Sequence, residues 1–188
     1  KDGGLHAGMA GNIGDSYAKM VAENDYNEYV LEISSFQLDG IMEFKPKVAV
    51  ITNITPDHLD RYDYKFENYI ASKFRIAMNQ DESDYLIYDV DDKVIREWLK
   101  KHPVQSKLLP FSLKEKQEEG AWLENGTIKL KVEQKTLDMS TDILALEGQH
   151  NVKNTMAASL AALLVNVRKE TIRKSIQTFQ GVPHRLEK

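Results

Sequence analysis

Val48-Ala-Val-Ile-Thr-Asn-Ile-Thr-Pro-Asp-His-Leu-Asp60 is the stretch of sequence that decides the fold. Its first four residues are apolar, which indicates a strand buried on both faces, as in a parallel sheet with helices on either side. Thr55 can cap a new helix that has Pro56 at its first position. His58 would then lie in the first turn of that helix, just beyond the carboxyl end of a strand. Open α/β sheets bind their ligands at this place.

A second helix, predicted from Lys65 to Met78, carries a lysine in an unusual position. At about 100° per residue, Lys73 lies at the centre of the apolar face of this helix. The other members of that face are Phe66, Tyr69, Ile70, Ile76 and Ala77. An isolated ammonium group is costly to bury, so Lys73 must be paired, neutral or chemically modified, unless its stem carries the charge to the surface. Its spacing from His58 favours a functional role.

The composition limits the classes of protein to which the chain can belong. Its 188 residues suffice for one α/β domain, and 25 basic against 29 acidic residues give a net charge of −4. The charges are interspersed, and no apolar stretch approaches the roughly 18 residues of a membrane helix. The absence of cysteine excludes a disulfide scaffold and thiolate metal sites. We therefore expect a cytoplasmic protein that binds neither nucleic acid nor membranes. We also expect a monomer, although the sequence does not give the oligomeric state.

Polar residues follow the elements predicted in the first third of the chain. Gly11-Asn-Ile-Gly14 precedes a helix predicted at 15–23, and its glycines would let the backbone approach an anion, although an ordinary tight turn has the same pattern. Glu32 interrupts the apolar strand predicted at 29–33, where a carboxylate needs a cation or donors beside it. The polar turn at 34–37 could present its hydroxyls and amide to a ligand.

Glu32 and His58 would share one crevice if the strands ending near Glu32 and Asn53 were parallel neighbours. Carboxylate and imidazole ligands suit Mg²⁺ or Mn²⁺. Zinc is the alternative, because Asp57, His58 and Asp60 offer nitrogen and oxygen ligands for a metal-dependent phosphoesterase. Asp57 and Asp60 could instead favour the amino end of a helix electrostatically. A binding domain without catalysis would fit the composition equally well.

The remaining pattern predicts an α/β fold with a mostly parallel sheet flanked by helices. Strands are predicted at 84–89 and 107–111, with a helix at 91–101 between them and an exposed connection at 112–120. Alternation around Asn125-Gly126 predicts a hairpin at 121–132. With 136–139, this hairpin would form a small antiparallel sheet appended to the parallel one.

A helix rich in alanine and leucine is predicted from about Asn151 to Val167. Asn151 and Asn154 share one face of its first turn, so their amides could read the donor and acceptor of an adenine edge. Capping by Asn151 is the alternative. A last helix is predicted at 169–179.

Taken together, these segments resemble the central domain of the Mur ligases, the ATP-dependent amino-acid ligases of peptidoglycan synthesis. They occur in the family's order: Gly11-Asn-Ile-Gly14, Glu32-Ile-Ser-Ser-Phe-Gln-Leu38, Asn53-Ile-Thr-Pro-Asp-His-Leu-Asp60, Lys73, His150-Asn-Val-Lys-Asn154 and His184-Arg185. The resemblance implies a fold similar to that of P-loop NTPases over 1–180, and a linker to a carboxyl-terminal domain that starts at 181–188. The family's first strand and phosphate-binding loop have no counterpart in 1–188, so we expect these residues alone to be inactive.

The segment after Glu32 most resembles the family member that adds D-glutamate to UDP-N-acetylmuramoyl-L-alanine. Another amino-acid-adding Mur ligase is the alternative. In this family, ATP phosphorylates the carboxylate of the UDP-sugar peptide, and the incoming amine then attacks the acyl phosphate.

The resemblance also implies roles for individual residues. Glu32 would bind the Mg²⁺ that bridges the ATP phosphates, and His58 would bind a second Mg²⁺. Lys73 would hold that site as a carbamate, because a core-facing lysine has a lowered pKa and its neutral amine can add CO₂. These three would be the catalytic residues. The other matches are Asn12, Ser34 and Gln37 with UDP-sugar contacts, Asn151 and Asn154 with adenine contacts, and Arg185 with a nucleotide contact.

Overall fold

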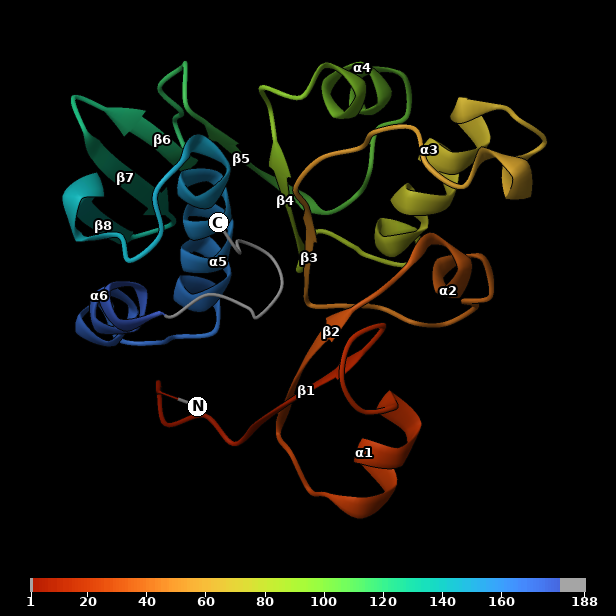
Figure 1. The fold of residues 1–188 in the computed structure, drawn as a ribbon, viewed down its shortest axis with the longest axis horizontal. Helices are drawn as coiled ribbons and strands as arrows, with labels where there is room; N and C mark the ends of the chain where they lie inside the picture. The colour runs from red at the N-terminus through yellow and green to blue at the C-terminus, as the bar shows by residue number, and fades with distance from the viewer. Residues whose placement is uncertain (1, 180–188) are drawn as a thin grey trace. The chain divides into compact units, whose positions relative to one another are not determined.

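The computed structural model describes residues 2–179, which form two compact units (Figure 1). The first unit takes in the chain up to Lys45 together with Pro56–Asn79. The second takes in Pro46–Thr55 together with the chain from Gln80 onward. None of the helices in 2–179 combines the length and the apolar character that a membrane span requires.

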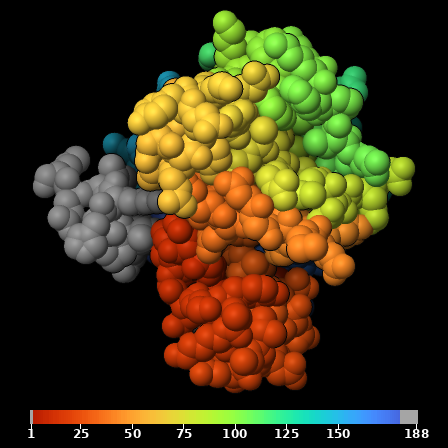
Figure 2. Space-filling view, turned by 90° about the vertical axis from the view of Figure 1, so that its right-hand side faces the viewer, coloured from red at the N-terminus to blue at the C-terminus, as the bar shows by residue number. Residues whose placement is uncertain are grey.

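The first unit contains a small parallel sheet and several short helices. Its elements are β1 Ala7–Gly11, α1 Tyr17–Glu23, β2 Glu28–Glu32, α2 Ser35–Asp39, the 3₁₀ helix η1 Leu59–Tyr62, α3 Phe66–Phe74 and the 3₁₀ helix η2 Arg75–Ala77. Strands β1 and β2 pair in parallel, with Gly11 opposite Glu32. Figure 2 shows the η1–α3 segment, in yellow, at the surface.

Polar contacts hold α2 and α3 together within this unit. The Tyr62 hydroxyl donates to Asp39 Oδ2 at 2.9 Å and lies 3.2 Å from Ser72 Oγ. Ser72 is almost fully buried, and its hydroxyl donates to the Ser35 carbonyl at 3.0 Å. Buried polar groups of this kind must find partners, so the contacts specify how the two helices pack.

The second unit is a six-stranded mixed sheet with α5 packed against it (Figure 1). Its elements are β3 Val48–Ile51, β4 Tyr85–Asp89, α4 Lys93–Lys101, β5 Lys107–Ser112, β6 Gly120–Glu124, β7 Thr127–Val132, β8 Lys135–Ser140, η3 Thr141–Ile143, α5 Gln149–Leu164 and α6 Lys169–Thr178. The strand order is β3-β4-β5-β6-β7-β8, with parallel pairing as far as β6 and antiparallel pairing beyond it. The predicted α/β class and the appended antiparallel sheet are therefore confirmed.

The main core of this unit lies between the sheet and α5. Alternate residues of the strands, such as Ile87, Phe111 and Leu130, are buried against Met156 and Leu160 of α5. Each fully buried side chain of this size contributes about 1.5–3 kcal/mol. The apolar face of α5 therefore fixes the helix on the sheet, and with it the position of the first turn of α5.

The predicted hairpin forms at Asn125-Gly126, and a glycine marks the point where the pairing changes direction. Asn125 and Gly126 have φ of +49° and +71°, as a type I′ turn requires. Gly120 opens β6 with φ of +118°, and a Cβ there would lie 2.0 Å from the Pro110 carbonyl oxygen. Only two residue pairs join β5 to β6.

The prediction that the strand β3 is buried on both faces is wrong. Val50 on β3 is 36% exposed, so this strand is buried through Ala49 and Ile51 on one face and not on both. Within the described residues, β2 pairs with β1 and β3 pairs with β4, in two separate sheets. The connection predicted at 112–120 is exposed over most of its length, but Ser112 at its start is fully buried, and the Ser112 hydroxyl accepts the Lys114 and Glu115 N–H groups.

Candidate functional site

Glu32 ends β2 in the first unit, and the turn after β1 encloses the end of that strand. The Asn12 N–H donates to the Glu32 carbonyl at 2.7 Å, and Asn12 Nδ2 donates to Glu32 Oε1 at 3.3 Å. Gly11 has φ of +116°, and a Cβ there would lie 2.2 Å from the Glu32 carbonyl oxygen. Only glycine permits this approach, and the result is an exposed carboxylate oriented by an amide.

The predicted polar turn after Glu32 is the start of helix α2. Ser34 is the N-cap and accepts the Gln37 N–H at 3.3 Å, while Gln37 Oε1 accepts the Ser34 N–H at 2.9 Å. This reciprocal capping box satisfies two N–H groups at the start of the helix. The side chains of Ser34 and Gln37 are therefore held beside each other.

The structure contradicts the α-helix predicted to start at Thr55. His58 has φ of +48° and is the N-cap of the 3₁₀ helix η1. Asp57 stabilises this geometry, because its Oδ1 accepts the His58 N–H at 2.8 Å and its Oδ2 lies 3.5 Å from His58 Nε2. Left-handed backbone costs a residue other than glycine about 1–2 kcal/mol. His58 is thus held in a strained conformation beside Phe36, whose ring centroid is 5.1 Å from that of the imidazole.

Lys73 lies near the end of α3 and is half-buried, as its place on the apolar face predicted. Its Nζ is 5.5 Å from the centroid of the Tyr69 ring. Burial lowers the pKa of Lys73 below its ordinary value of 10.5, while the carboxylates of Asp57 and Glu32 act in the opposite direction. Burial thus acts on the pKa of Lys73 in the direction expected for a core-facing lysine, and two carboxylates lie close enough to act on the amine.

The metal-binding potential of the first unit depends on few donors. Within residues 2–179, no three histidine, aspartate or glutamate side chains are gathered as a metal site requires. A zinc site made of Asp57, His58 and Asp60 is therefore not formed. The exposed carboxylate of Glu32 and the Asp57–His58 pair remain as oxygen and nitrogen donors, and a cation there would need further ligands from a bound substrate.

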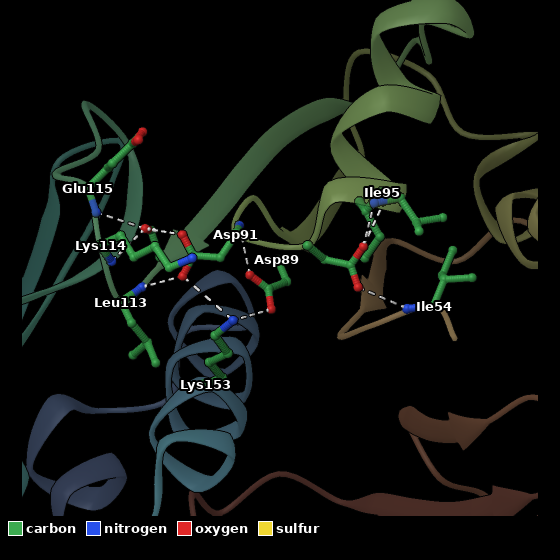
Figure 3. A network of polar contacts seen from close by, with 11 residues as sticks. Ile54, Asp89, Asp91, Ile95, Leu113, Lys114, Glu115 and Lys153 are labelled. Carbon is green, nitrogen blue, oxygen red and sulfur yellow. Dashed lines mark hydrogen bonds and ion pairs between the residues drawn. The ribbon is translucent and has the colours of Figure 1, made fainter. Parts of the chain in front are cut away.

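In the second unit, the segment Asp89–Asp92 joins four parts of the fold (Figure 3). Asp92 caps α4 by accepting the Val94 and Ile95 N–H groups at 2.8 and 3.1 Å, and it also accepts the Ile54 N–H at 3.2 Å. Asp91 accepts the Ser112 hydroxyl at 2.7 Å and the Leu113 N–H at 2.8 Å.

Asp89 binds the first turns of α5 through Lys153, whose Nζ is 2.7 Å from Asp89 Oδ2. Lys153 Nζ is also 3.6 Å from Asp91 Oδ2. Burial raises the pKa of Asp89 above its ordinary value, and the hydrogen bond from Lys153 acts in the opposite direction. The ion pair therefore compensates part of the cost of burying this carboxylate.

A cavity of about 240 Å³ lies at the carboxyl ends of β3 and β4, where an α/β sheet is expected to bind ligands. It is lined by Thr52, Asn53, Asp89, Asp91, Asp92, His150, Lys153 and Asn154. Its volume is smaller than that of sites for drug-sized ligands, which are roughly 300–1,000 Å³. The enclosed part of the cavity is therefore of a size for a single heterocycle.

Comparison with known proteins establishes the family of the chain. The family model described as the Mur ligase middle domain matches residues 13–162. The chain belongs to the Mur ligase family. The UDP-N-acetylmuramoylalanine–D-glutamate ligase of Christiangramia forsetii is 62% identical over 188 residues, which are all of this chain and 42% of that protein. The protein of the same name from Bacteroides fragilis is 47% identical with the same coverage. The chain thus spans less than half the length of these curated relatives.

Solved Mur ligase structures share the fold. The UDP-N-acetylmuramate:L-alanyl-gamma-D-glutamyl-meso-diaminopimelate ligase from Neisseria meningitides has a TM-score of 0.68 at 18% identity, covering 96% of this chain and 60% of that one. MurF from Acinetobacter baumannii has a TM-score of 0.66 at 20% identity, covering 95% and 42%.

Among the residues that the Mur ligase resemblance singled out, one lines the cavity and others contact protein groups. Asn154 lines the cavity, whereas Asn151 is buried beside it and donates to the Glu147 carbonyl at 2.7 Å. Asn12 contacts Glu32, and Asp57 contacts His58. Arg185 lies outside the described residues.

The sequence analysis assigned no role to Asp89, Asp91 and Lys153, which line the cavity. The available signal was a group of aspartates at the end of the strand predicted at 84–89, since parallel strands present ligand-binding residues at their carboxyl ends.

Proposed function

We propose that the protein to which these residues belong is an ATP-dependent ligase that adds D-glutamate to UDP-N-acetylmuramoyl-L-alanine in peptidoglycan biosynthesis. The observation that supports this proposal most directly is the 62% identity, over the whole chain, to a relative of that name. In the proposed reaction, ATP transfers its γ-phosphate to the carboxylate of the UDP-sugar peptide. The amine of D-glutamate then attacks the acyl phosphate and displaces phosphate.

The cavity beside α5 is the proposed site for the base of ATP. It contains the amide of Asn154 and the imidazole of His150, which can hydrogen-bond to a heterocycle. Asn151 would support the same turn of α5 from its buried position. Arg185 is proposed as a further nucleotide contact from outside the described residues.

Glu32 and His58 are proposed to bind two Mg²⁺ ions, with the bound substrates supplying further ligands. Glu32 supplies an exposed carboxylate that Asn12 orients, and Asp57 fixes the backbone of His58. Bound Mg²⁺ would stabilise the negative charge that develops during phosphoryl transfer. Lys73 would contribute as a carbamate, because its lowered pKa leaves more of the neutral amine that adds CO₂.

Asn12, Ser34 and Gln37 are the proposed contacts for the UDP-sugar peptide. Asn12 is hydrogen-bonded to Glu32, and Ser34 and Gln37 follow the end of β2. Because the capping box fixes Ser34 and Gln37, a substrate would meet a preorganised surface there. We further propose that the enzyme acts as a cytoplasmic monomer.

The full-length protein tests this proposal. We expect ADP release from ATP only when both UDP-N-acetylmuramoyl-L-alanine and D-glutamate are present. L-lysine and meso-diaminopimelate are the controls, because turnover with either in place of D-glutamate would indicate another member of the family. Phosphoester cleavage in the absence of ATP would instead support a hydrolase and contradict the proposal.

A second experiment tests the role of Lys73 in the same protein. Lys73→Ala should abolish turnover, and short-chain carboxylates should partly restore it by occupying the position of the carbamate. Wild-type turnover of this variant at low bicarbonate would contradict the proposed role.

A further inference from the structure

We propose that Lys153 is a positioning residue, which fixes the first turns of α5 on the end of β4 and so holds His150 and Asn154 at the cavity for the nucleotide base. This inference rests on the proposed function of that cavity. Lys153 would then act near the base of the nucleotide and would not contact the phosphates.

The contacts of Lys153 show a side chain whose charge is already matched. Its Nζ is 2.7 Å from Asp89 Oδ2 and 3.6 Å from Asp91 Oδ2, and the two carboxylate side chains are only 5% and 6% exposed. Figure 3 shows Lys153 pointing from α5 to both aspartates. A lysine held between two desolvated carboxylates has little charge left to attract an anion.

The two aspartates are themselves fixed from the opposite side. Asp89 Oδ1 accepts the Asp91 N–H at 2.9 Å, and Asp91 accepts the Ser112 hydroxyl and the Leu113 N–H. These contacts anchor both carboxylates to the ends of β4 and β5. Lys153 therefore binds to a rigid point of the sheet and not to a mobile side chain.

The start of α5 needs such an anchor. Its N-cap is Gly148, which makes no side-chain capping bond, and φ of +101° at this residue places it outside helical geometry. His150, Lys153 and Asn154 share one face of the helix, because residues three and four apart lie side by side. The ion pair of Lys153 therefore sets the direction in which His150 and Asn154 point.

The charge of the cavity argues against a phosphate at this place. Its lining includes the carboxylates of Asp89, Asp91 and Asp92, and Lys153 is the only lysine or arginine among the described residues that form it. A triphosphate would meet a negative surface here, whereas an uncharged base would not. Replacing a phosphate-binding lysine should weaken the binding of ATP but not of adenosine. Replacing a positioning lysine should weaken the binding of both.

The experiment compares ATP with adenosine in the full-length protein, with affinities measured by calorimetry. Lys153→Met should weaken both ligands by a similar factor, about tenfold, which corresponds to the loss of one charged hydrogen bond. Lys153→Arg should restore most of the affinity, since it keeps the charge. The matched control is Lys174→Met on α6, an exposed lysine whose loss should change neither affinity.

Two further measurements keep the proposal testable if the Lys153→Met variant is unstable. Asp89→Asn should weaken ATP and adenosine together, and its effect should not add to that of Lys153→Met in the double variant. Hydrogen exchange of the amides at 149–154, measured without nucleotide, should accelerate in Lys153→Met. That change is expected only if the lysine orders the helix start.

Several outcomes would overturn the inference. A loss of ATP affinity without a loss of adenosine affinity would show that Lys153 contacts phosphate. Unchanged affinities for both ligands would show that the ion pair does not position the site. If the wild-type protein bound neither ligand, both the proposed function of the cavity and the inference about Lys153 would fail. The two results above would contradict only the inference about Lys153.

Discussion

Replacing Asp92 by alanine should destabilise the second unit, because one carboxylate accepts three N–H groups. Two of these belong to Val94 and Ile95 in the first turn of α4, and the third is the N–H of Ile54, a residue that is only 3% exposed. Loss of a helix N-cap costs about 1 kcal/mol. A buried N–H left without an acceptor costs about 1–3 kcal/mol more. We therefore expect the free energy of unfolding to fall by roughly 2–4 kcal/mol.

Urea denaturation measures this loss, with the fluorescence of Trp98 on α4 as the probe. The chain has two tryptophans, so a Trp122→Phe background leaves Trp98 as the only reporter. Asp92→Asn should cost less than Asp92→Ala, because the amide oxygen can still cap α4. Asp138→Ala, at an exposed ion pair with Lys129, should cost at most about 1 kcal/mol. A loss below about 0.5 kcal/mol in Asp92→Ala would refute the reasoning, since changes of that size are typical of surface positions.

Three further predictions concern the candidate sites. ¹³C-bicarbonate should give a carbamate NMR signal in the full-length protein with Mg²⁺ and nucleotide, and the signal should be lost in Lys73→Arg; its persistence would place the carbamate elsewhere. Because the folded pKa of Lys73 lies below its ordinary value of 10.5, the unfolded state binds more protons between the two values. The free energy of unfolding, compared with Lys73→Met in bicarbonate-free buffer, should therefore rise with pH across that window, and a flat difference would contradict the shift. Asn154→Ala should weaken the binding of ATP by about 0.5–1.5 kcal/mol and leave the binding of the UDP-sugar unaffected. Asn151→Ala should also lower the free energy of unfolding. Equal weakening of both ligands by Asn154→Ala would indicate a folding role.

Local patterns predicted the parts of the fold that depend on neighbouring residues. Asn125-Gly126 can adopt positive φ at both positions, so this dipeptide specifies its hairpin without help from the rest of the chain. The apolar face of α3 likewise predicted the half-buried position of Lys73, because helical periodicity alone determines which residues share a face.

The missed features depend on residues far apart in the sequence. Asp89 and Lys153 are separated by 64 positions, and neither has a local pattern that names the other as its partner. At Thr55-Pro56 the local helix signal was misleading, because Asp57 stabilises a left-handed His58 and delays the helix to Leu59. The partners of β2 and β3 were also beyond local reasoning, since strand pairing is decided by long-range contacts.

The antiparallel strands β6 to β8 have a consequence for the order in which this unit can fold. Their pairs join close neighbours, such as Glu124 with Thr127 and Val132 with Lys135, so little chain entropy is lost when they form. Strand β3 must instead wait for β4, which follows only after the whole η1–α3 segment has been synthesised. We expect β6–β8 to form quickly and to offer the slower parallel strands an edge on which to assemble, so the end of the sheet farthest from the cavity is the part that can form first.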